Sequence, residues 1–148
     1  MSGLVSDDEL VRYFPGYTID HDSAAHFRGR LERHLLINRC EACSTWHQPP
    51  MPVCPACWNT GVEPTEVAGT GTIHMTVFLH QGPPTPGVDY SPPHPVTTVE
   101  LDEQPGLRYT STVVGAANDE ITIGRRVRLD WMDRGGVPLP VFRLEKAD

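Results

Sequence analysis

Hydrophobic and polar residues alternate along the second half of the chain, as they do in β-strands with one buried face. The stretch GTIHMTVFLH (71–80) would place Ile73, Met75, Val77 and Leu79 on one face of a strand. Turn residues separate four further strand-like runs: PVTTVELDE, LRYTSTVVG, RRVRLDWMDR and PLPVFRLEK. The segment AANDEITIG, before the fourth strand, predicts a small helical or turn insertion. Five short strands with such an insertion predict a compact Greek-key barrel of the OB type.

The first part of the chain has a different pattern, which predicts a short helix near the N-terminus. Ser6 and Glu9 have the spacing of a capping box, and Val5 and Leu10 are placed for a hydrophobic staple. Pro15 would end this helix because proline cannot continue a helical hydrogen-bond ladder. The acidic start of the chain lacks the basic and apolar segments of a secretory signal peptide.

A second helix is predicted to begin near residues 20–22. It carries Phe27 and Leu31 one turn apart on one face, and it contains Gly29, which costs about 1 kcal/mol against alanine. The residues LLIN (35–38) then predict a strand that leads into the first cysteine. The expected class is therefore mainly β with N-terminal helices. Its predicted divisions are a helical segment (1–36), a four-cysteine zinc ribbon (37–63) and an OB-fold barrel (64–148).

All four cysteines lie in two C-x-x-C pairs, at Cys40, Cys43, Cys54 and Cys57. Two such pairs can present four thiolates tetrahedrally, which is the ligand set of a closed structural zinc site. We expect one structural Zn²⁺ per chain, because paired C-x-x-C motifs in a reducing compartment indicate a metal more often than disulfides. Four thiolates also hold iron, so a rubredoxin-like electron carrier remains an alternative. A four-cysteine site leaves no position for a metal-bound water or substrate, which disfavours metal-assisted hydrolysis.

Aromatic and arginine residues near this cluster invite two further interpretations. Trp46 and Trp58 are expected to shield the metal loops. Arg28, Arg30 and Arg33 lie on the predicted second helix, where they could meet an acidic partner surface or a phosphate.

One long irregular segment, HQGPPTPGVDYSPPHP (80–95), separates the first two predicted barrel strands. Loops of this length inside a compact domain are usually functional or mobile. His80, Asp89, Tyr90 and His94 are therefore the weak candidates for contact with a ligand or a substrate channel. Surface or strand positions without a catalytic task are the simpler interpretation of these residues.

Composition and charge narrow the functional classes. The net charge is 12 − 19 = −7, and residues 61–148 alone sum to 7 − 12 = −5, which argues against a polyanion partner. No apolar run reaches the about 20 residues that a membrane span needs. The expected location is the cytoplasm, and neither nucleic acid nor a membrane is the expected partner. The chain has no P-loop, G-x-G-x-x-G, G-x-S-x-G or H-E-x-x-H motif, so no catalytic residue is predicted.

The order of a helical N-terminus, a four-cysteine ribbon and an OB-like barrel resembles a known family. It is the zinc-ribbon/OB-fold family catalogued as domain of unknown function thirty-five, whose members are associated with acyl-CoA metabolism. The resemblance rests on RCEAC, PPMPVCPAC, GTGTIHMTVFLH, HPVTTVELDE, ITIGRRVRLDW and PVFRLE, and it covers nearly the whole chain from about Asp20. Two features depart from the commonest pattern, namely RHLLINRC before the first cysteine and the loop HQGPPTPGVDYSPPHP.

What the resemblance implies is an accessory subunit rather than an enzyme that acts alone. Members accompany thiolase-superfamily enzymes, including lipid-transfer-protein-like thiolases and retro-aldolases that shorten steroid-acyl-CoA side chains. The partner carries the catalytic residues, while the zinc-ribbon protein holds the hetero-oligomer together and can shape the entrance for a shared acyl-CoA substrate. Only the four cysteines carry over, as zinc ligands. An OB-fold nucleic-acid-binding module and a rubredoxin-like electron carrier remain the alternatives.

Overall fold

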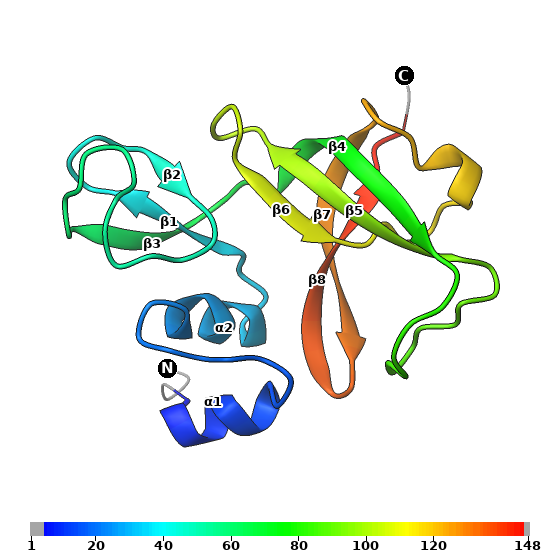
Figure 1. The fold of residues 1–148 in the computed structure, drawn as a ribbon, viewed down its shortest axis with the longest axis horizontal. Coiled ribbons are helices and arrows are strands. Elements are labelled where there is room, and N and C mark those ends of the chain that lie inside the picture. The colour runs from blue at the N-terminus through cyan, green and yellow to red at the C-terminus, as the bar shows by residue number, and fades with distance from the viewer. Residues whose placement is uncertain (1–4, 147–148) are drawn as a thin grey trace. The chain divides into compact units, whose positions relative to one another are not determined.

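The computed structural model describes residues 5–146, so parts of the predicted acidic start and of the predicted barrel end lie outside it. Its residues group into two compact units (Figure 1). The first unit runs to Val67 and includes Gly136–Pro138, and the second comprises 68–135 and the residues from Leu139 onward. Each unit has its own secondary structure and its own buried core.

The first helix, α1 (Asp7–Tyr13), begins with the predicted capping box. The hydroxyl of Ser6 accepts a hydrogen bond from the Glu9 backbone N–H (3.3 Å), and the Glu9 carboxylate accepts one from the Ser6 N–H (3.1 Å). The second helix, α2 (Ala24–Leu31), begins slightly later than predicted. A turn precedes it because the Asp20 carboxylate accepts hydrogen bonds from the backbone N–H groups of the two residues just before Ala24, at 3.0 and 2.9 Å. The Asx-type turn therefore sets the start of the helix.

The two helices enclose a small aromatic core formed by Leu10, Phe14 and Phe27. Arg30 was expected to face a partner, but its side chain is buried here, with 4% exposed. Its guanidinium carbon lies 4.8 Å from the ring centroid of Phe14, which is a cation–π contact. Arg28 is also used internally, because its Nε donates to the Val5 carbonyl oxygen at 3.0 Å. Arg30 is therefore not accessible to a partner, and Arg28 is engaged by groups of its own chain.

Gly29 has a packing role that explains its position inside α2. A Cβ at this position would lie 2.8 Å from the His34 carbonyl oxygen and 2.9 Å from Cδ1 of Leu36. The chain turns back at this point, and the His34 N–H donates to the Gly29 carbonyl oxygen (2.8 Å). Glycine therefore permits the first strand to pass directly against the helix.

A three-stranded antiparallel sheet of order β2-β1-β3 follows the helices. Its central strand is β1 (Leu36–Cys40), flanked by the short β2 (Trp46–His47) and by β3 (Val62–Glu66). β1 ends at the first cysteine. The sheet thus fixes the backbone from which the first metal loop begins.

The second unit is the predicted five-stranded barrel sheet, with the order β6-β5-β4-β7-β8. Val113, just beyond β6, forms a parallel bridge with Phe142 of β8, so the two outer strands of the curled sheet approach each other. The mainly β fold with N-terminal helices is therefore confirmed. The elements are β4 (Thr70–Leu79), β5 (His94–Leu101), β6 (Arg108–Ser111), the 3₁₀ turn η1 (Asn118–Glu120), β7 (Arg126–Arg134) and β8 (Val137–Leu144).

A β-bulge in β4 overturns the predicted face assignment of that strand. Ile73 pairs with Val99 and Met75 pairs with Thr98, so His74 is the extra residue in the ladder. Ile73 is buried, whereas Met75 is 51% exposed, because an extra residue moves the following side chains to the opposite face. Val77 and Leu79 are exposed in the same way. The prediction that all four share one face is wrong beyond the bulge.

Charged residues on the barrel pair locally. The guanidinium of Arg126 donates two hydrogen bonds to the carboxylate of Asp102, at 2.7 and 2.6 Å. This bidentate contact lowers the pKa of Asp102 to about 2. Across residues 5–146, no helix is long and apolar enough to cross a membrane.

Candidate metal centre

Two loops with the same backbone pattern hold the four cysteines. In the first loop, the Cys40 N–H donates to the Thr45 carbonyl oxygen (2.8 Å), and the Ser44 N–H donates to the Cys40 carbonyl oxygen (3.0 Å). The second loop repeats these contacts at equivalent spacings. There the Cys54 N–H donates to the carbonyl oxygen five residues on, and the Trp58 N–H donates to the Cys54 carbonyl oxygen, both at 2.9 Å.

The tight turn in each loop ends at a residue with positive φ. Ser44 has φ of 64° and Trp58 has φ of 67°, and both are the fourth residue after the first cysteine of their pair. This left-handed conformation is uncommon for residues other than glycine and occurs mainly at turns. It reverses the chain after each C-x-x-C pair, so both sulfurs of a pair can point to one side.

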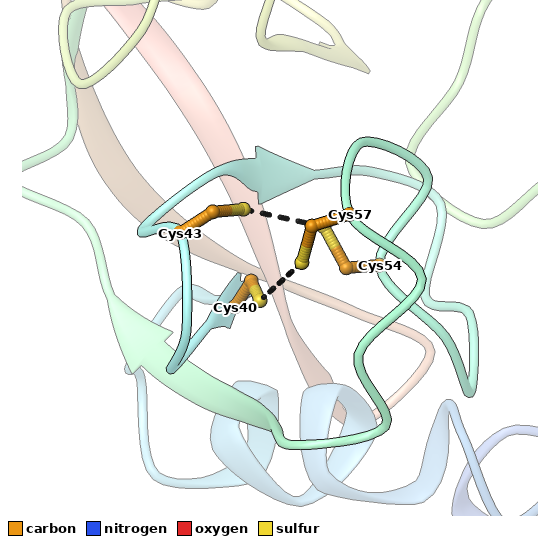
Figure 2. A group of neighbouring side chains, drawn as sticks. All are labelled: Cys40, Cys43, Cys54 and Cys57. Carbon is orange, nitrogen blue, oxygen red and sulfur yellow. Dashed lines mark hydrogen bonds between the residues drawn. The ribbon is translucent and has the colours of Figure 1, made fainter.

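The four sulfurs converge between the two loops (Figure 2). Cys40 Sγ lies 3.6 Å from Cys57 Sγ, Cys43 Sγ lies 3.6 Å from Cys54 Sγ, and all four sulfurs lie within 4.8 Å of one another. A tetrahedron with Zn–S bonds of about 2.3 Å has edges of about 3.8 Å. The donor set and its spacing therefore fit a tetrathiolate metal ion, and the four cysteines form a candidate metal-binding site.

The protonation states of the thiols also favour a cation at this place. Contacts with the side chain and backbone of Thr45 lower the pKa of Cys43 to about 6; the Thr45 hydroxyl oxygen is 3.1 Å from Cys43 Sγ. The backbone hydrogen bond at Asn59 lowers the pKa of Cys57, but its contacts with other thiols raise that pKa to about 12. Four thiols so close together cannot all lose their protons without a compensating positive charge. A divalent metal would supply that charge.

Burial divides the four ligands into two kinds. Cys40 and Cys54, the first cysteine of each pair, are buried, whereas Cys43 and Cys57 are exposed. The buried cysteines anchor the loops, and the exposed ones complete the site from the solvent side. Thr45 was not among the predicted site residues, since a hydroxyl two residues beyond a cysteine carries no distinctive sequence signal.

The two tryptophans near the cysteines differ in their surroundings. Trp46 is half-buried, and Arg39 lies over its ring with the guanidinium carbon 5.4 Å from the centroid. Trp58 is 81% exposed. Trp58 therefore does not shield the metal loop, contrary to the sequence prediction, because the left-handed turn directs it into solvent.

The structure places His80, Asp89 and Tyr90 in the segment between β4 and β5, and His94 is the first residue of β5. His80 and Asp89 are exposed, while Tyr90 and His94 are half-buried. The rings of Tyr90 and His94 meet edge to face, with centroids 6.4 Å apart. Burial, followed by the nearby charge of Arg134, lowers the pKa of His94. The structure thus brings Tyr90 and His94 together.

Internal contacts organise this loop. The Tyr90 hydroxyl donates to the Pro83 carbonyl oxygen (2.9 Å), and a Cβ at Gly82 would lie 2.5 Å from that hydroxyl oxygen. The Asp89 carboxylate accepts a hydrogen bond from the Ser91 N–H (3.0 Å). Such contacts are typical of a compact loop packed by its own side chains.

Comparisons with known proteins identify both parts of the chain. Residues 27–63 match the family model described as the rubredoxin-like zinc ribbon domain of ChsH2, and residues 64–132 match that of the ChsH2 C-terminal OB-fold domain. A probable enoyl-CoA hydratase alpha subunit from Thermomonospora curvata is 40% identical over 130 residues, which are 87% of this chain and 39% of that protein. The chain therefore spans about two fifths of that relative.

Two scaffold proteins and two solved structures are also similar. A DUF35 domain-containing scaffold protein from Pyrococcus furiosus is 33% identical over 54% of this chain and 55% of its own length. Another from Methanothermobacter thermautotrophicus is 32% identical over 65% of this chain and 70% of its own length. A chain of the Ltp2–ChsH2(DUF35) aldolase has a TM-score of 0.77 and 40% identity, covering 86% of this chain and 98% of that one. A DUF35 protein of unknown function from Sulfolobus solfataricus shares the fold, with a TM-score of 0.58 and 12% identity over 92% of this chain and 98% of its own.

Proposed function

Because this chain belongs to the DUF35 family, with zinc-ribbon and OB-fold domains of the ChsH2 type, we propose that it is an accessory subunit of an acyl-CoA enzyme. The observation that carries this proposal is the similarity to a ChsH2(DUF35) chain along 98% of that chain, at 40% identity. That chain was solved as part of an aldolase whose name also contains Ltp2. The proposed partner is accordingly an Ltp2-type, thiolase-like subunit that carries the catalytic residues.

The metal centre supports a structural role for this chain. We propose that Cys40, Cys43, Cys54 and Cys57 hold one Zn²⁺, in keeping with the zinc ribbon named by the matching model. Four protein thiolates fill a tetrahedral shell, so no coordination position remains for substrate. The metal then fixes the two loops to each other and leaves the chemistry to the partner.

The proposed reaction class is aldol cleavage of a β-hydroxyacyl-CoA thioester. Hydration of an enoyl-CoA gives a β-hydroxyacyl-CoA, and an aldolase cleaves such a compound into a carbonyl compound and a shortened acyl-CoA. One relative is named as a hydratase subunit and another as an aldolase, and a β-hydroxyacyl-CoA is the product of the first reaction and a substrate of the second. In its most specific form, the proposed substrate is a CoA thioester whose acyl group is a steroid side chain.

The two alternative functions have less support. A nucleic-acid-binding OB barrel presents aromatic side chains to bases, but Tyr109 and Phe142 are buried in this barrel core. An electron carrier would need iron in place of zinc at the four cysteines. The protein is made in medium that contains both metals, and its metal is then analysed. Colourless protein with zinc excludes the electron carrier, whereas red protein with iron supports it.

Co-expression with the Ltp2 subunit of the similar aldolase tests the proposal. Size-exclusion chromatography with light scattering should give one complex that contains both chains, and its mass gives the stoichiometry. Two separate peaks at micromolar concentration would contradict the proposed partnership.

A further inference from the structure

The bulge at His74 creates a stripe of apolar side chains on the outer face of the barrel. Met75, Val77 and Leu79 are 51%, 46% and 37% exposed, and we call these three residues the β4 stripe. The residue paired with Val77 on β5 is Val96, which is half-buried and extends the apolar surface sideways. Surface faces of barrel strands are ordinarily polar, so an apolar row of this kind indicates a contact surface.

The same part of β4 also has an open backbone edge. β4 pairs with β7 only from Thr70 to Thr72. The last contacts on this side are at Ile73, whose N–H donates to the Arg125 carbonyl oxygen and whose carbonyl oxygen accepts from the Gly124 N–H, both at 2.9 Å. β7 begins at Arg126, so the part of β4 beyond Ile73 extends past the start of β7. Within residues 5–146, the ladder from 75 to 79 therefore has β5 on one side only.

An edge of this kind is a template for another strand. Alternate residues of an antiparallel strand direct their N–H and C=O groups away from the paired neighbour, so residues 74–79 offer hydrogen-bonding groups on the open side. Proteins commonly protect such edges with lysine, proline or inward-pointing charges. The segment HMTVFL (74–79) contains no proline and no lysine, arginine, aspartate or glutamate. The segment therefore carries neither proline nor charge as protection of its edge.

The size of the surface decides between two occupants. The β4 stripe consists of three partly exposed side chains, which offer far less than the about 800 Å² that each partner buries in a stable complex. A second copy of this chain that paired edge to edge here would bury too little area for a stable dimer. A larger subunit that places one strand on this edge as part of a wider interface meets the requirement.

We propose that the open edge of β4 (residues 74–79) receives an extended strand of the catalytic partner subunit, with alternate apolar side chains packed on the β4 stripe. Backbone hydrogen bonds to the edge give affinity, and the apolar contacts fix the register of the added strand. This inference rests on the proposed function, because the partner is the Ltp2-type subunit. It adds which surface of the accessory chain that subunit uses.

The test is binding of Ltp2 to the full chain and to two lysine variants. Val77→Lys places a charge in the middle of the β4 stripe, and it should weaken binding by about tenfold or more. Ile123→Lys is the matched control, because Ile123 is 70% exposed and lies outside β4. It should bind like the wild type. Leu79→Lys provides a second variant of the stripe should Val77→Lys fold poorly.

Hydrogen exchange tests the backbone hydrogen bonds of the added strand, which the lysine variants do not test. On addition of Ltp2 to the wild-type chain, the exchange rate of amides within residues 74–79 should fall by about tenfold or more, because hydrogen bonds to the added strand protect them. Unchanged exchange there, or equal Ltp2 binding by Val77→Lys and wild type, overturns the inference and leaves the proposed function intact. Self-association of the free chain that Val77→Lys abolishes also overturns it. Absence of any wild-type complex overturns both.

Discussion

Removal of one buried metal ligand should unfold the ribbon and leave the barrel folded. Cys54 is buried at the base of the second loop, where its backbone N–H donates to the Asn59 carbonyl oxygen and its C=O accepts from the Trp58 N–H. Cys54→Ala removes one of four sulfurs and leaves three thiols with an incomplete tetrahedron. The metal should then be lost from the protein after gel filtration.

The expected size of the effect follows from how little else holds the ribbon together. Between residues 37 and 63, Ile37 is the buried aliphatic side chain, and the other buried hydrophobic positions are Cys40 and Cys54 themselves. Burial of one isoleucine contributes about 1.5–3 kcal/mol. Structural zinc contributes about 10–16 kcal/mol to the folding of a small zinc domain. Loss of the metal therefore removes the dominant stabilising term of the ribbon.

The barrel has an independent core and should survive this change. Its buried residues include Ile73, Val99, Val127 and Phe142, and none of them belongs to the ribbon. Amide exchange should therefore become fast across 36–66 while β4 to β8 stay protected. Ala56→Ser, a non-ligand change between the two cysteines of the second loop, is the matched control and should keep one metal per chain. A Cys54→Ala protein whose ribbon amides stay protected would show that the metal does not hold the ribbon together.

Three further changes test particular contacts. Gly29→Ala should destabilise the first unit by about 1 kcal/mol in urea unfolding, since a Cβ only 2.8 Å from a backbone carbonyl oxygen outweighs the gain in helix propensity; equal or higher stability would contradict the packing argument. Arg126→Gln should move the Asp102 carboxyl titration, followed by NMR, from a pKa of about 2 toward the ordinary value of about 3.9. This half-exposed pair stabilises the barrel by about 0.5 kcal/mol above pH 4, and that contribution is lost as the pH falls toward 2; an unchanged midpoint would argue against it. Burial lowers the pKa of His26, so the unfolded chain binds a proton that the folded chain resists, and stability should fall below pH 6.5. His26→Gln should flatten this pH dependence, whereas the same change at the exposed His21 should not; identical profiles for the two variants would rule out this origin.

The features that could be predicted from the sequence are those set by short-range spacing. Two C-x-x-C pairs require only local turns and one chain reversal to bring four sulfurs together, and the structure contains this cluster. Ser6 and Glu9 form the capping box because both partners lie within one helical turn. The strands of the barrel also follow from alternation and turn residues. These signals need no knowledge of distant contacts.

The features that could not be predicted depend on contacts between distant segments. Alternation assigns side chains to the correct face of a strand only while the ladder is uninterrupted. The sequence around His74 does not mark the bulge that moves Met75, Val77 and Leu79 to the opposite face. Arg30 is a charged residue that the sequence alone would place at the surface, yet its guanidinium lies against Phe14 and Tyr17 from an earlier part of the chain and against Phe27 of its own helix. Charge and hydropathy alone do not show such an environment.

We propose above all that this chain supports a catalytic partner and has no complete active site of its own. The most direct measurement is cleavage of a steroid β-hydroxyacyl-CoA by the chain alone, by Ltp2 alone and by the purified mixture, with the shortened acyl-CoA quantified by mass spectrometry. We expect no product from the chain alone, little from Ltp2 alone and sustained turnover from the mixture. Turnover by the isolated chain, or equal turnover by Ltp2 with and without it, would contradict the claim.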